Sequence, residues 1–193
     1  MALPPTPRTV QRTYLILLLG NTLAASLIWG INTIFLLDAG LSNLEAFAAN
    51  AFFTAGMVLF EVPTGIVADT VGRRPALLTF QAGAFAMVLF YSQLTDATAL
   101  LVAGAVMGMF VNGMLGGYGA LLSELYPTEA RATAENVLFN LGRGVGGFGP
   151  FVVGALAVTY SFAVAIALLA TIYLIDIVAT LLLIPERRGQ PLN

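Results

Sequence analysis

Long apolar runs alternate along the chain with short polar connectors. A transmembrane helix needs about 20 mostly apolar residues. Three runs carry no charged side chain, one carries only Glu61, and a final apolar stretch is too long for a single crossing and contains Tyr160-Ser161 as a break. The pattern predicts six transmembrane helices, over residues 14–37, 46–68, 75–95, 98–122, 136–159 and 162–184.

The expected fold class is therefore all-α, a polytopic membrane helix bundle. We expect a cytoplasmic segment over residues 1–13, the six-helix transmembrane domain over 14–184 and a cytoplasmic tail over 185–193. The composition agrees, because 59% of the residues are hydrophobic and only 9% are charged, whereas soluble domains have about 25% charged residues.

The composition also excludes several classes of function. The chain has no Cys and no His, which excludes disulfides, Cys/His zinc sites and His-based catalytic triads. A net charge of −2 with no basic cluster argues against a nucleic-acid partner. We find no nucleophile–base pair and no metal cluster, so we expect a protein that is not an enzyme and that needs no cofactor.

The connectors between the predicted helices alternate in charge. Those beginning at Asp38, Asp96 and Tyr160 contain no Lys or Arg, and arginines occupy the others. Because cytoplasmic connectors are enriched in Lys and Arg, both termini are predicted to be cytoplasmic. The arginines of that side are Arg8, Arg12, Arg73, Arg74, Arg131, Arg187 and Arg188.

The connector between the second and third predicted helices carries the most informative motif. Gly65 allows a neighbouring helix to approach closely, and Gly72 suits a tight turn. Asp69 lies just beyond the hydrocarbon region, where a carboxylate can cap a helix N-terminus. Arg73 and Arg74 can hold a carboxylate or a lipid phosphate. Charge alone favours a turn whose arginines fix the topology.

The spacing Gly65-xxx-Asp69-xx-Gly72-Arg73-Arg74, with Phe60–Thr64 before it, resembles the signature loop of the major facilitator superfamily. Its transporters have twelve helices in two related halves of 3+3 inverted repeats. The resemblance implies that Asp69 and the two arginines form a cytoplasmic gating latch, and that the protein resides in a bacterial inner membrane.

A second resemblance lies downstream. Asn112-Gly113, the segment Ser123–Thr133 and the segment Phe139–Arg143 are similar to the tenth and eleventh helices of the proton-coupled sugar and organic-acid symporters of that family. The tail Pro185–Gly189 resembles the ending found after each half's last helix. The first two predicted helices thus resemble the N-terminal half, and the last four the C-terminal half.

The resemblance implies membrane transport of a small solute by alternating access, in which substrate binds between two six-helix halves. A half-size unit supplies one wall of that cavity, so transport requires a homodimer or a partner half. The alternative is a non-transporting bundle, either a recombined remnant or an accessory membrane subunit.

Ionisable residues inside the predicted spans are candidate functional residues. Asp176, near the centre of the last span, either carries a proton or contacts substrate, or else makes a structural hydrogen bond. Glu61 lies two turns before Asp69 and belongs either to the latch or to a proton path. Arg143 can pair with Glu124, Glu129 or Asp69. Glu61, Glu124, Arg131 and Arg143 together form the predicted cytoplasmic charge network.

The remaining polar and small residues allow two interpretations. Amides within the spans either hydrogen-bond between helices or line an aqueous cavity, and the candidates for substrate contact are Asn32, Asn112 and Asn140. Gly104 and Gly108 form a small-xxx-small face that permits close packing within the bundle or between subunits. The Gly-x-Gly-x-x-Gly pattern at 144–149 follows no strand, so we interpret it as helix packing with a hinge at Gly149-Pro150.

Overall fold

The computed structural model describes residues 32–125 and 147–184, together with Ile16, Gly20, Thr22, Ala25, Ser26, Thr133, Asn136, Val137, Asn140, Leu141, Gly144 and Val145. Within this part of the chain the long elements are all helices. They are α2 (Asn43–Val71), α3 (Arg73–Tyr91), α4 (Ala97–Leu125), α6 (Gly149–Thr159) and α7 (Phe162–Leu183). No strand occurs among the described residues, as the all-α prediction requires.

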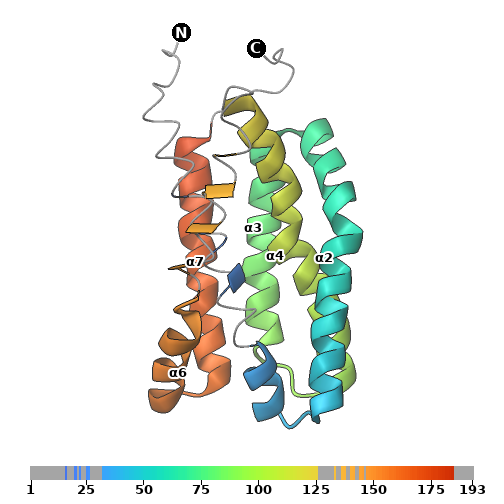
Figure 1. The fold of residues 1–193 in the computed structure, drawn as a ribbon, viewed down its shortest axis with the longest axis vertical. Helices are drawn as coiled ribbons and strands as arrows, with labels where there is room; N and C mark the ends of the chain where they lie inside the picture. Colours follow the sequence, from blue (N-terminus) through green and yellow to red (C-terminus); the bar gives the residue numbers. More distant parts are fainter. Residues whose placement is uncertain are drawn as a thin grey trace.

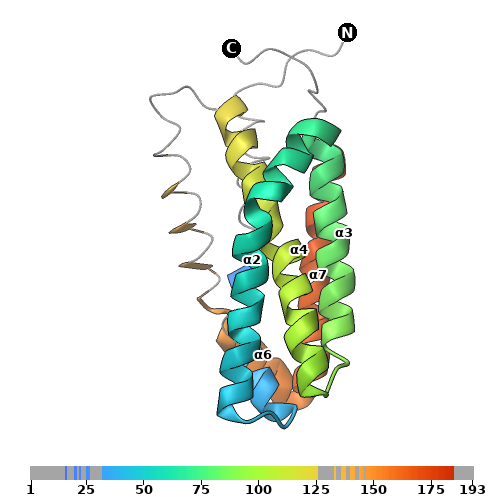
Figure 2. The ribbon, with the colours of Figure 1, turned by 90° about the vertical axis from the view of Figure 1, so that its right-hand side faces the viewer.

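The helices form an elongated bundle, with α4 packed between α2 and α3 (Figures 1 and 2). Helix α3 also packs against α7, and the short helix α6 packs against α7 (Figure 1). Residues 32–38 are helical as well and form the described end of the first predicted helix. The predicted count of six helices stays a prediction, because much of residues 1–31 and 126–146 lies outside the described part.

Helix α2 passes into α3 through a single residue, Gly72. Its φ of 112° and ψ of 151° lie in a region that is essentially restricted to glycine. The Gly72 N–H donates to the carbonyl of Ala68 (3.2 Å), and its carbonyl accepts from the N–H of Ala76 (3.2 Å). The expected connector over residues 69–74 is therefore wrong in extent, because both helices continue to the glycine.

At the opposite end of the bundle, three helices begin with side-chain caps. Ser42 and Glu45 form a capping box at the start of α2. Asp96 Oδ2 accepts from the N–H of Ala99 (2.8 Å) before α4, and Ser161 Oγ accepts from the N–H of Val164 (3.2 Å) before α7. Each cap satisfies an orphan N–H of a helix N-terminus. The connectors without Lys or Arg thus carry the acceptors that helix N-termini require.

Helices α2 and α4 cross with their backbones in close contact. A Cβ placed on Gly56 of α2 would fall on the carbonyl oxygen of Ala105, and one placed on Gly108 of α4 would fall on the carbonyl oxygen of Phe53. A Cβ placed on Gly104 would lie 3.6 Å from the carbonyl oxygen of Ala49, so Gly104 faces α2 as well. The small-residue face of α4 therefore serves packing within the bundle.

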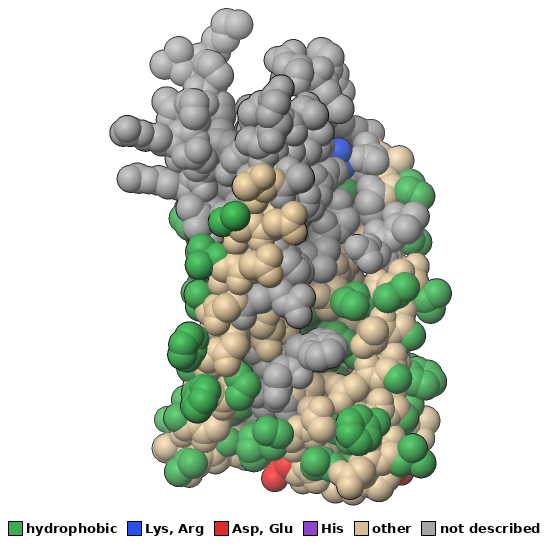
Figure 3. Space-filling view, in the orientation of Figure 1, with side chains coloured by type: hydrophobic (Ala, Val, Ile, Leu, Met, Phe, Trp, Pro, Cys, Tyr) green, Lys and Arg blue, Asp and Glu red, His purple; other side chains and the backbone are tan. Residues whose placement is uncertain are grey.

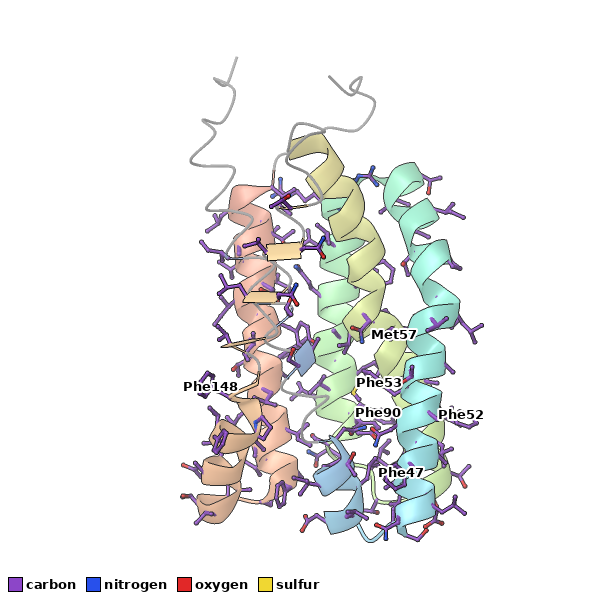
Figure 4. All side chains as sticks on the ribbon, in the orientation of Figure 1. Phe47, Phe52, Phe53, Met57, Phe90 and Phe148 are labelled. Atoms are coloured by element: carbon purple, nitrogen blue, oxygen red, sulfur yellow. The ribbon has the colours of Figure 1, made fainter. Side chains whose placement is uncertain are left out.

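The exterior of the bundle is apolar. Phe47 and Phe52 point outward from α2, while Phe53 is buried (Figure 4). Figure 3 shows apolar side chains along both sides of the visible face, between Arg side chains near one end and Asp and Glu side chains at the other. Two described segments, Asn43–Phe60 and Phe162–Leu182, have the length and hydropathy of membrane spans. This surface suits contact with lipid.

The single helix predicted over residues 136–159 is interrupted. Gly147 and Phe148 form a turn, and the Phe148 N–H donates to the carbonyl of Val145 (3.1 Å). Helix α6 then begins at Gly149 with Pro150 in its first turn. Proline has no N–H and fits the first turn of a helix. The predicted hinge at Gly149-Pro150 therefore adjoins a break in the helix.

Candidate functional site

The buried face of α7 carries a row of polar side chains. Tyr173, Asp176 and Thr180 recur at helical spacing, and all three are 0% exposed. The side chain of Asp176 therefore lies inside the bundle and not on its outer surface. Neither carboxyl oxygen of Asp176 has a hydrogen-bond partner in the described part of the chain.

The carboxyl group of Asp176 lies directly on Gly20 of the first predicted helix. A Cβ placed on Gly20 would fall on Oδ1 of Asp176, with the carboxyl carbon at 3.1 Å and Oδ2 at 3.4 Å. Any larger residue at position 20 would need the carboxyl group or the helix to move. Gly20 thus makes the close approach of this helix to α7 possible.

One turn further along α7, a buried polar pair links this helix to α3. Gln81 Nε2 donates to Thr180 Oγ1 (2.8 Å). Gln81 is 0% exposed, and its Oε1 has no hydrogen-bond partner among the described residues. Of the two interpretations given for amides within the spans, the structure shows the interhelical bond for Gln81.

A second amide pair joins the first helix to α2. Asn32 Nδ2 donates to Asn50 Oδ1 (2.8 Å), and Asn50 Nδ2 donates to Thr33 Oγ1 (2.9 Å). Asn32 is 3% exposed. This network fixes the contact between the two helices, in agreement with the interhelical interpretation of Asn32.

The predicted gating motif is partly described. Arg74 Nη2 donates to the carbonyl oxygen of Leu181 (2.8 Å), in the last turn of α7. Carbonyls at a helix C-terminus lack intrahelical partners and attract cations. The backbone of Gly65 and Asp69 lies in α2, but the side chain of Asp69 falls outside the described part. Arg74 therefore connects the start of α3 to the end of α7.

Replacing Arg74 by Ala should loosen this end of the bundle. We expect the free energy of unfolding to fall by roughly 1 kcal/mol, because the contact is exposed and charge–dipole contacts at helix ends contribute about 0.3–1 kcal/mol. Thermal unfolding in mild detergent measures the effect. Arg74→Lys keeps the charge and should retain part of the stability. Equal stability of wild type and Arg74→Ala would contradict the proposed role of this contact.

The other predicted site residues are distributed over the bundle. Asn112 is 8% exposed and lies in α4. Asn140 is exposed and donates to the carbonyl of Asn136 (2.8 Å). The side chains of Glu61, Glu124, Arg131 and Arg143 lie outside the described part, so the predicted charge network stays a prediction. No group of three or more metal-ligating side chains occurs among the described residues.

Two residues of this site were not predicted from the sequence. Gly20 has no side chain and therefore no chemical signature, and its role depends on which helix packs beside it. Thr180 lies four residues after Asp176, which places both on one face of α7. This spacing is the feature of the sequence from which Thr180 could have been predicted to lie beside Asp176.

These features define an integral membrane helix bundle with a few polar residues buried between its helices. The sequence model of the Major Facilitator Superfamily matches residues 14–193. The chain belongs to this family of membrane transport proteins, as its signature loop predicts.

The chain is similar to bacterial proteins named as transporters. It is 61% identical over 139 residues to a putative metabolite transport protein of Haemophilus influenzae, covering 72% of this chain and 33% of the relative. It is 32% identical over 129 residues to a probable 4-methylmuconolactone transporter of Cupriavidus pinatubonensis, covering 65% and 30%. The chain thus spans about a third of the length of these relatives.

Solved structures share the fold at low sequence identity. A mutant of the peptide transporter POT in complex with sulfate gives a TM-score of 0.74 at 18% identity, covering 89% of this chain and 37% of that chain. The human organic anion transporter TETRAN gives a TM-score of 0.71 at 18% identity, covering 95% and 49%. The fold therefore corresponds to part of a larger transporter fold.

Proposed function

We propose that the chain forms one half of a solute transporter that works by alternating access. The family match over residues 14–193 carries this proposal. Transporters of this fold bind substrate near the bilayer midplane, between two repeats that move against each other. The chain matches about a third of the length of its relatives, and we propose that the second wall of the cavity is supplied by another copy or by a partner half.

Small organic acids are the solutes that we propose. The related proteins include a cis,cis-muconate transport protein of Acinetobacter baylyi and a 4-hydroxybenzoate transporter of Pseudomonas putida. Coupling to protons would allow uptake of such anions against their gradient. The membrane is the bacterial inner membrane, as the name of a related Escherichia coli protein supports.

Uptake by reconstituted vesicles tests the transport proposal. Purified protein, with its oligomeric state determined in mild detergent, is given radiolabelled 4-hydroxybenzoate, muconate or nicotinate with and without an inward proton gradient. We expect uptake of at least one acid by a dimer or larger assembly. A strict monomer without uptake of any solute would contradict transport and favour the non-transporting alternative.

Neutralising the predicted latch should impair this uptake. We expect Asp69→Asn to lower the initial rate by tenfold or more, because the latch would no longer stabilise one of the two access states. Asp38→Asn is the matched control, since Asp38 is an exposed carboxylate outside the motif. Equal rates for the two variants would argue against a gating role for Asp69.

Cysteine labelling tests the proposed orientation. The chain has no native Cys, and exposed threonines lie at both ends of the bundle, Thr70 near the end of α2 and Thr95 before α4. A membrane-impermeant maleimide added to intact cells should label Thr95→Cys, and Thr70→Cys only after permeabilisation. The reverse pattern would invert the topology and place both termini outside.

A further inference from the structure

Among the described residues, the surroundings of Asp176 contain no charged group that could balance a carboxylate. Its own helix offers Tyr173 as the other titratable residue. On α3, the stretch between Arg74 and Tyr91 contains no titratable side chain, and α6 contains none. The described residues of the first helix before Asp38 carry no charge. Arg74 is engaged at the carbonyl of Leu181.

The unsatisfied polar atoms around α7 include several that can only accept hydrogen bonds. Among the described residues they are the two oxygens of an ionised Asp176 and Oε1 of Gln81. The amide nitrogen of Gln81 donates to Thr180, one turn after Asp176 on α7. A buried acceptor without a donor is unfavourable, and a buried charge without a partner is more so. A proton on Asp176 removes the charge and supplies a donor at the same time.

We propose that Asp176 is a proton-binding site at the contact between the first helix and α7, and that the bound proton permits this contact. This assignment rests on the proposed proton-coupled transport. The O–H bond of the acid breaks when water reaches the carboxyl group, the proton passes to that water, and the carboxylate keeps the electron pair.

Gly20 makes the site sensitive to conformation. With the first helix seated, the carboxyl group is covered by the backbone of Gly20 and is 0% exposed, so the proton cannot exchange with solvent. When this helix moves away from α7, water can enter and the proton can leave. The resulting carboxylate opposes return of the helix, because reseating would bury its charge. Proton release and helix separation are thus linked.

A sodium ion fits this position less well than a proton. A metal ion needs several oxygen ligands around it, whereas the position that a Cβ of Gly20 would take already coincides with Oδ1 and lies 3.4 Å from Oδ2. A proton adds almost no volume. The contact between the helices therefore favours the proton as the bound cation.

Infrared spectroscopy tests the site without requiring transport. Protein labelled with ¹³C-aspartate is reconstituted in lipid vesicles, and the C=O stretch of protonated carboxylic acids is recorded at neutral pH. We expect a protonated-aspartate band in wild type and in Asp38→Asn, and its loss in Asp176→Asn. Retention of the band in Asp176→Asn, or its absence in wild type, would overturn the assignment. Loss of the band on adding sodium chloride at constant pH would assign the site to a metal cation instead.

Gly20→Ala tests the link to helix packing. The added methyl group must displace either the first helix or the carboxyl group of Asp176. We expect this displacement to let water reach the carboxyl group and to raise the deuterium-exchange rate of the band at least tenfold. Gly154→Ala is the control, because a Cβ there has nothing within 4 Å; it should exchange as slowly as wild type. Equal exchange in all three proteins would refute the link. If Gly20→Ala fails to fold, the infrared comparison of wild type with Asp176→Asn still tests the proton-binding site.

These outcomes separate the proton site from the transport proposal. A protonated Asp176 in protein that moves no solute would keep the site and refute transport. Uptake with no protonated Asp176 would keep transport and refute the site.

Discussion

Gly108→Ala should destabilise the bundle by about 3 kcal/mol, the upper part of the range for overpacked cores. The reason is the identity of the obstructing atom. A Cβ at position 108 meets the carbonyl oxygen of Phe53, which belongs to the backbone of α2 and cannot turn aside as a side chain can. The two helices must separate, and buried apolar contacts such as those of Met107 and Phe53 would weaken with them.

Matched variants identify the cause of such a loss. Gly154→Ala adds the same methyl group to α6, where a Cβ has nothing within 4 Å, so its stability should match or slightly exceed that of wild type. Gly56→Ala acts at the same crossing from the other helix. Because either substitution alone separates α2 from α4, the double variant should lose less than the sum of the two. Thermal unfolding in one detergent measures the four variants and the wild type, and full additivity would refute the shared mechanism.

The positions of the membrane helices could be predicted closely, because long apolar runs leave few alternatives. The span predicted over 162–184 is observed as Phe162–Leu183, and that over 98–122 as Ala97–Leu125. The boundaries that shifted depend on local chemistry. Ser42 and Glu45 form a capping box that starts α2 three residues before the predicted position. That Ser-x-x-Glu spacing was visible in the sequence.

The break before α6 could not be predicted from apolarity. The stretch from 144 to 159 is hydrophobic whether its helix continues or stops, and only Gly149-Pro150 indicated a hinge. The actual turn, at Gly147 and Phe148, lies before it because the proline fits the first turn of the new helix.

The candidate site was predictable in its chemistry but not in its contacts. A lone carboxyl group in an apolar span identified Asp176 as buried. Its neighbour Gly20 lies 156 positions away in sequence, counting from 20 to 176, and Gln81 meets Thr180 through a crossing of α3 and α7. Such pairings depend on how the helices pack, which the pattern of a single helix does not encode.

Gly72→Ala should be the most damaging substitution at the predicted gating motif. The observed φ of 112° and ψ of 151° place an L-residue in a region that costs about 1–3 kcal/mol. The substitution also affects two helix ends, since Gly72 donates to Ala68 and accepts from Ala76. Relaxing the strain would turn α3 relative to α2 and draw Arg74 away from Leu181.

A double-mutant cycle in thermal unfolding separates strain from the lost arginine contact. If Gly72→Ala already displaces Arg74, then adding Arg74→Ala should cost little more, and the double variant should fall short of the sum. If Gly72→Ala strains only its own backbone, the two losses should add. A wild-type melting temperature for Gly72→Ala would show that the junction tolerates a side chain, and that the glycine of the motif serves something other than the turn.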